Sequence, residues 1–187
     1  MRLADYTRRL RFDVSETLQE RYWCDLDVMR QPLMRYGLLG VTDTYPNGIG
    51  YLGKRLVGDQ FIISGDGTGA IEFTDGQLYS RVKVYLQDGF EVADGKIAPP
   101  WESYLVGGLM LNQCAKARTF VVTRSDRVEC DIEMCEYCET LDQCREYIAG
   151  NDVPVEGIIS VKCVPDMIIA YGKMLDSVCL RLVNALR

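Results

Sequence analysis

Short strand-like runs separated by turn residues fill the middle of this 187-residue chain. Each run is rich in β-branched or aromatic residues, and glycine or aspartate marks the turns between runs. Such a pattern is typical of an antiparallel sheet. Strands are predicted at residues 51–57, 61–64, 71–73, 81–86, 119–123, 157–161 and 167–171.

Helix-like segments flank these runs on both sides. Apolar residues recur at three- and four-residue steps over 14–37, where Pro32 is expected to kink or split the helix and Gly37 to form its C-terminal turn. Thr140 has the position of an N-cap, because Gln143 follows three residues later. Helices are predicted at residues 14–37, 101–114, 140–149 and 173–186. The pattern and the length indicate one layered α/β domain over residues 1–187.

Histidine is absent from the chain. The absence excludes a Ser-His-Asp triad, a Cys-His dyad and an imidazole zinc site. Any catalysis must therefore use carboxylate, thiolate, tyrosine, lysine, backbone groups or an external cofactor.

The charge balance argues against a nucleic-acid partner. The chain has 21 lysines and arginines against 27 aspartates and glutamates, a net charge of −6, whereas a nucleic-acid platform needs a basic stripe. Residues 126–146 hold eight of the acids and two of the bases, so this segment alone accounts for the net charge of −6. This segment is interpreted as a solvated loop and helix face, with a docking patch for a basic protein partner as the alternative.

The expected location is the cytoplasm. No apolar run approaches the roughly 18 residues of a membrane span, so no membrane association is expected. The first residues lack the apolar segment of a secretory signal. A chain of this size with a full core needs no disulfides, and its cysteines are expected to stay reduced.

Four of the eight cysteines lie close together in sequence, at Cys130, Cys135, Cys138 and Cys144. The first three have the spacing of plant-type ferredoxin ligands. Four thiolates could also form a histidine-free zinc site, which Cys163 could join. The neighbouring acids disfavour a cluster of thiolates. No cofactor is therefore expected, with Zn or an Fe–S cluster held by Cys130, Cys135, Cys138 and Cys163 as the alternative.

Several segments in order resemble the class II aldolase/adducin family. Residues 45–51 and 61–69 are similar to its two phosphate-binding turns, and Pro-Pro-Trp-Glu-Ser at 99–103 is similar to its Pro-Ser-Ser-Glu segment. Residues 161–176 resemble its closing strand-turn-strand-helix unit. The resemblance implies a three-layer α/β/α domain with a mainly antiparallel central sheet, and a homo-oligomer, commonly a tetramer.

The family's enzymes hold a divalent metal with three histidines, two of them in a His-x-His strand, beside an acid/base glutamate. Here Glu102 matches the glutamate. The His-x-His strand matches residues 121–123, or 123–125 if the register slips by two, and the third histidine falls near 163–165; none of these positions holds histidine. Glu102 could be a surviving base, but an acid at the start of a helix is more often placed there by the helix dipole.

The resemblance also implies an anion-binding turn. Its first turn becomes approximately residues 50–53, without the family's asparagine and serine. The second turn keeps Ser64, Gly65, Thr68 and Gly69, although Asp66 would repel a phosphate. Trp101 replaces a pocket serine and could fill the former cavity.

Three functional hypotheses follow. The favoured one is a divergent, histidine-less aldolase/adducin-like protein that acts as a non-catalytic binding or scaffolding subunit. The alternative is a metal-dependent lyase or epimerase-type enzyme with thiolate and carboxylate ligands and Glu102 as acid/base. The third is a redox or thiol sensor that uses the cysteines at 130–144.

Overall fold

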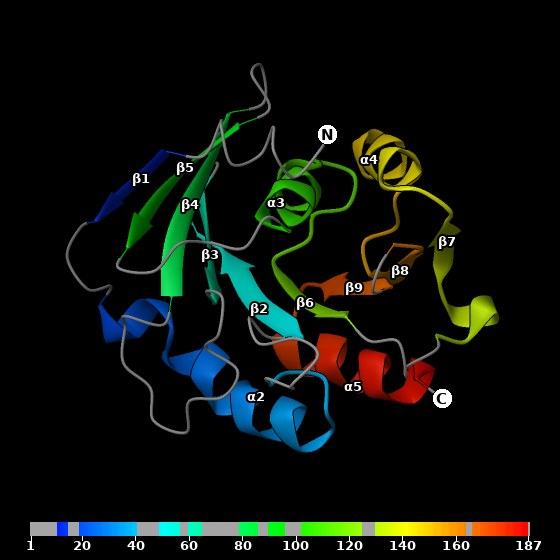
Figure 1. Cartoon of the computed structure of the whole chain (residues 1–187), viewed down its shortest axis with the longest axis horizontal. Helices are drawn as coiled ribbons and strands as arrows, with labels where there is room; N and C mark the ends of the chain where they lie inside the picture. Colours follow the sequence, from blue (N-terminus) through cyan, green and yellow to red (C-terminus); the bar gives the residue numbers. More distant parts are fainter. Residues whose placement is uncertain are drawn as a thin grey trace.

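A nine-stranded sheet organises the parts of the chain that the structure describes. The computed structural model describes residues 11–14, 19–40, 49–56, 60–64, 79–85, 90–95, 102–124, 130–163 and 166–186. Within these residues the strand order is β1-β5-β4-β3-β2-β6-β9-β8-β7 (Figure 1). The strands are β1 Arg11–Val14, β2 Gly50–Arg55, β3 Gln60–Ser64, β4 Tyr79–Tyr85, β5 Phe90–Gly95, β6 Thr119–Arg124, β7 Glu136–Cys138, β8 Gly157–Val161 and β9 Met167–Gly172.

Most neighbouring strands run antiparallel. The exceptions are the two edge strands, since β1 pairs with β5 and β7 pairs with β8 in parallel. All the internal pairings, from β5–β4 across to β9–β8, are antiparallel. The predicted α/β class with a mainly antiparallel sheet is confirmed.

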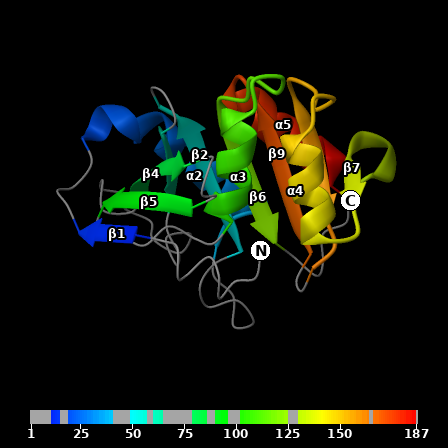
Figure 2. The ribbon, with the colours of Figure 1, turned by 90° about the horizontal axis from the view of Figure 1, so that it is seen from above.

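Helices cover both faces of the sheet. Helices α3 and α4 lie on one face, and α2 and α5 lie on the other (Figures 1 and 2). Each face has its own apolar core of buried residues. The described helices are η1 Glu20–Tyr22, α2 Cys24–Arg35, α3 Ser103–Leu111, η4 Ile132–Met134, α4 Leu141–Ala149 and α5 Leu175–Ala185.

Strand β6, near the middle of the sheet, contributes side chains to both cores. Phe120 and Val122 belong to the core under α3 and α4, whereas Val121 belongs to the core under α2 and α5. This is the two-residue alternation of a strand that is buried on both faces. The alternation fixes which β6 residues can face the start of α3.

Helix α2 is shorter than the predicted helix at 14–37, and it passes through Pro32 without ending there. The predicted C-terminal turn at Gly37 is confirmed. Gly37 has a φ of 72°, its N–H donates to the Met34 carbonyl at 3.0 Å, and the next N–H, of Leu38, donates to the Leu33 carbonyl at 3.0 Å. These two bonds form a Schellman motif, in which glycine takes the left-handed position at no steric cost.

Helices α3, α4 and α5 lie within the ranges that the sequence predicts, and the sequence did not predict η4. The sequence did not predict β1, β5 or β7. The strand predicted at 71–73 lies outside the described residues. No helix in the described part of the chain is long and apolar enough to cross a membrane.

Candidate functional site

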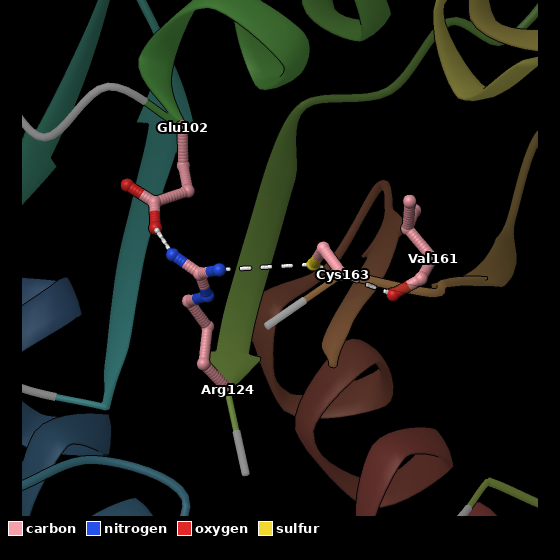
Figure 3. A network of polar contacts seen from close by, with 4 residues as sticks. All are labelled: Glu102, Arg124, Val161 and Cys163. Carbon is pink, nitrogen blue, oxygen red and sulfur yellow. Dashed lines mark hydrogen bonds and ion pairs between the residues drawn. The ribbon is translucent and has the colours of Figure 1, made fainter. Parts of the chain in front are cut away.

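Glu102 lies at the N-terminus of α3, facing β6. Its side chain is only 2% exposed, and its Oε1 accepts a hydrogen bond from Nη1 of Arg124 at 3.1 Å (Figure 3). The position suits the positive end of the helix dipole, as the sequence suggested. The carboxylate is also one half of a buried ion pair, which the sequence did not indicate.

Arg124 is the last residue of β6 and joins Glu102 to a third element. Its Nη2 lies 3.7 Å from the sulfur of Cys163, in the segment that connects β8 to β9. The Cys163 thiol lies 3.5 Å from the Val161 carbonyl oxygen, to which it donates. The Cys163 N–H donates to Oδ1 of Asp166 at 3.1 Å. One guanidinium therefore lies between a carboxylate from α3 and a thiol after β8 (Figure 3).

The Cys163 thiol is held in its protonated form. Burial raises its pKa above the ordinary value, and Asp166 raises it further, although the Arg124 guanidinium acts in the opposite direction. A protonated thiol is a weak hydrogen-bond donor and a poor nucleophile or metal ligand. At neutral pH the cluster therefore contains one carboxylate, one guanidinium and one neutral thiol.

The residues of β6 on the same face as Glu102 are the even-numbered ones, whereas the resemblance suggested odd-numbered ones. Arg124 points toward Glu102, and Val122 packs in the core on the same face. Thr123 points to the opposite face, where its hydroxyl donates to the Leu38 carbonyl at 2.9 Å. A His-x-His pair aimed at Glu102 would thus occupy 122 and 124. The resemblance instead matches 121–123 or 123–125, and a shift of one residue along a strand moves each side chain to the other face. That match stays a prediction.

Ser64, a predicted anion ligand, ends β3 and is 2% exposed. Its Oγ accepts a hydrogen bond from the Leu52 N–H at 3.1 Å, so the hydroxyl is bonded to the backbone of the neighbouring strand β2. Residues 50–53, matched to the first phosphate-binding turn, lie in strand β2 rather than in a turn. The other predicted anion ligands, Gly65, Thr68 and Gly69, lie outside the described residues. Trp101, predicted to fill the former cavity, also lies outside them.

The four cysteines predicted as metal ligands lie on both faces of the sheet. Cys130 and Cys135 pack against the core under α2 and α5, whereas Cys138 and Cys163 contact the core under α3 and α4. Among the described residues, no group of three or more histidine, cysteine, aspartate or glutamate side chains is arranged to hold a metal ion. All eight cysteines lie in described parts of the chain and are thiols rather than disulfides.

Sequence reasoning missed Arg124 as a site residue. It noted this position only as the middle of one possible His-x-His match. The available signal was a basic residue that directly follows the apolar run 119–123. A charge that continues a buried strand needs a partner, and Glu102 is the acid that begins the preceding helix.

Comparison with models of known protein families and with curated proteins finds no significant match to this chain.

Proposed function

We propose that this chain is a divergent, histidine-less domain of the class II aldolase/adducin type, with that family's three-layer arrangement, and that it acts as a non-catalytic binding or scaffolding subunit. One observation carries the proposal: the Arg124 guanidinium is hydrogen-bonded to Glu102, the residue that matches the family's acid/base glutamate. The mainly antiparallel sheet with helices on both faces agrees with this fold type.

A guanidinium at this position opposes metal-dependent chemistry in two ways. Arginine carries a permanent positive charge and has no lone pair to offer a metal, so it repels a divalent cation from the space beside Glu102. It also occupies Oε1, one of the two carboxylate oxygens that a general base could use to remove a proton. The Arg124 guanidinium supplies positive charge beside Glu102, as a metal ion would. Unlike a metal ion, it is not a Lewis acid and cannot coordinate a substrate.

The proposed binding role includes both copies of this chain and other proteins. The chain would form a homo-oligomer, a tetramer by resemblance. It would also bind a protein partner in the cytoplasm. We expect a second copy of this chain to cover large apolar side chains that are exposed in α2, directly after it and in α5, at Val28, Tyr36 and Leu180. Sedimentation analysis of the purified protein measures the oligomeric state directly.

The decisive experiment is a turnover assay. Purified protein is incubated with a panel of ketose and aldose phosphates, with and without Zn²⁺, Co²⁺ or Mn²⁺, and products are followed by NMR. We expect no retro-aldol, epimerase or dehydratase turnover under any condition. Metal-dependent turnover that is lost in E102Q, a variant whose folding is checked by circular dichroism, would overturn the proposal and favour the lyase or epimerase alternative.

A further inference from the structure

Strand β7 lies at one edge of the sheet and pairs on one side only within the described part of the chain. Its inner neighbour is β8, and no described strand lies along its outer side (Figures 1 and 2). An edge strand whose backbone groups are open is a template for a further strand from another chain. The outer edge of β7 is therefore a candidate interaction surface.

The backbone of β7 shows which groups point outward. The Cys138 carbonyl accepts from the Lys162 N–H, directly after β8, at 2.9 Å. Successive residues of a strand direct their N–H and C=O groups to opposite sides, so Tyr137 directs both of its groups away from β8. Cys135, two residues earlier, is also extended, with a φ of −135° and a ψ of 153°. No described residue forms a hydrogen bond to these outward groups of Cys135 and Tyr137.

The charge along this edge is negative. Glu133, Glu136 and Glu139 are exposed, and among the described residues none of the three has a basic partner. The nearby Asp142, in contrast, pairs with Arg145 at 3.4 Å. Two β7 edges from two copies of this chain would repel each other, whereas a basic strand would be attracted. The charge therefore favours a basic partner over self-pairing of this edge.

The side chains of β7 alternate between the two faces of the sheet. Cys138 belongs to the core under α3 and α4, so Glu136 lies on that face and Tyr137 lies on the other. The Tyr137 side chain is exposed, at 49%. Cross-strand pairs of opposite charge, and pairs of an aromatic with a β-branched or aromatic residue, are favourable. A strand that suits this edge has lysine or arginine opposite Glu136 and a β-branched or aromatic residue opposite Tyr137.

We propose that the outer edge of β7 binds an extended segment of a partner protein in which lysine or arginine alternates with β-branched or aromatic residues. The segment adds to the sheet as a further strand through the backbone groups of Cys135 and Tyr137. It is short, because the Glu139 N–H already donates to Gln143 Oε1 at 2.7 Å and closes the edge at that end. The inference rests on the binding role proposed above, to which it adds the surface and the chemistry of the partner.

The test begins with a phage-displayed library of short random peptides. The library is selected in parallel on the folded wild-type chain, on Y137P and on E20K. Proline at 137 removes the outward N–H donor and the ring, and it is tolerated on an edge strand. Glu20 is exposed in η1, at the opposite end of the molecule, so E20K is a control for charge reversal away from the edge (Figure 1). We expect peptides with alternating basic and apolar residues on the wild type and on E20K, and none on Y137P.

The most enriched peptide is then synthesised and titrated against each protein by fluorescence anisotropy. E136K should weaken binding about tenfold at low salt, because an attractive cross-strand pair becomes a repulsive one. E20K should change it less than about twofold, since its charge lies more than a Debye length from the peptide. Amide hydrogen exchange, followed by NMR, should slow at Cys135 and Tyr137 when the peptide binds, because strand pairing covers both N–H groups. Circular dichroism checks the folding of each variant.

Four results would overturn the proposal. They are a selection that enriches nothing on the wild type relative to Y137P, enriched peptides that are acidic or uncharged, and a bound basic peptide that leaves amide exchange at Cys135 and Tyr137 unchanged. The fourth is self-association that is lost in Y137P, which would assign the edge to a second copy. The turnover assay gives a separate answer: turnover would contradict a non-catalytic role without changing the peptide result, and a failed selection would leave the absence of turnover as it stands.

Discussion

In the described part of the chain, Arg30 is buried on one face of the sheet and Arg124 is largely buried on the other, and they are paired in different ways. The Arg30 side chain, in α2, is 2% exposed, and its Nε lies 3.3 Å from Oδ1 of Asp27 on the preceding turn of the same helix. The Arg124 side chain, in β6, is 15% exposed and pairs with Glu102 at the start of α3. The first pair is local in sequence, whereas the second joins two elements and approaches a third.

The exposure of the acidic partner is the second difference. Asp27 keeps 22% of its side chain exposed, so water can still stabilise its charge if Arg30 is removed. Glu102 keeps only 2% exposed, so water cannot take the place of Arg124 beside its charge. Long-range, buried polar contacts should therefore contribute far more to stability than local ones in this protein.

Removal of Arg124 is the strongest test of this difference. In R124M the chain keeps an apolar side chain of similar length but leaves Glu102 as a buried charge without its guanidinium. We expect a loss of about 3–5 kcal/mol in the free energy of unfolding, since breaking one half of a buried pair has this cost. Chemical denaturation monitored by circular dichroism measures the change.

The double variant E102M/R124M serves as the control. It removes both charges together, so no buried charge remains, and replacement of a buried pair by apolar side chains is often neutral. The double variant should be more stable than R124M alone. Equal destabilisation of the two proteins would mean that the loss in R124M comes from packing and not from the unpaired carboxylate.

Asn112 makes another long-range contact, between the ends of α3 and α4. Its Nδ2 donates to the carbonyls of Ile148 at 2.5 Å and Gly150 at 2.9 Å, and its Oδ1 accepts from the N–H groups of Cys114 at 2.8 Å and Ala115 at 3.1 Å. Loss of these bonds in N112A should cost about 2–3 kcal/mol. The same denaturation assay measures it, with N151A as a nearby exposed control that should have almost no effect.

The local pair on the other face should matter less. In R30M the side-chain stem remains in the core and Asp27 stays partly hydrated, so we expect a loss of about 1–2 kcal/mol. Asp142 and Arg145 offer a matched comparison, because they have the same three-residue spacing at 3.4 Å but are exposed. R145M should change stability by less than about 0.5 kcal/mol. If R30M lost as much free energy of unfolding as R124M, the local ion pair would not be weaker than the long-range one.

The same division between local and long-range contacts explains what the sequence could predict. The Gly37 turn, the Thr140 cap and most strand positions depend on a few consecutive residues, and they were predicted correctly. Strands β1 and β5 pair although residues 11–14 and 90–95 lie far apart in sequence, so no local signal indicates their pairing.

The candidate site was predicted in part for the same reason. The sequence, with the family resemblance, named Glu102 and the region of Cys163, and the structure places Arg124 between them. The resemblance matched β6 at 121–123 or 123–125, whereas Val122 and Arg124 lie on the face toward α3. In a strand that is buried on both faces nearly every residue is apolar, so its sequence alone does not indicate which residues share a face with Glu102. Only the packing of α3 against the sheet decides that 122 and 124, rather than 121 and 123, face Glu102.

The Thr140 cap is the smallest of the predicted effects. Thr140 Oγ1 accepts from the Gln143 N–H at 3.1 Å, and Gln143 Oε1 accepts from the Glu139 N–H at 2.7 Å, so each side chain satisfies a backbone donor at the start of α4. T140A should cost about 1 kcal/mol, the usual value for loss of an N-cap. T140S keeps the acceptor and should retain most of the stability.

Coupling between the two capping residues distinguishes a local contact from a long-range one. The two side chains accept from different backbone donors at the start of a single helix, so in a double-mutant cycle T140A and Q143A should show a coupling energy of only about 0.5–1 kcal/mol, the low end for neighbouring residues. The corresponding cycle for Glu102 and Arg124 should show several times this value, because the two charges contact each other directly where little water reaches either side chain. Similar coupling energies in the two cycles would mean that burial of Glu102 does not make its ion pair stronger than a local contact.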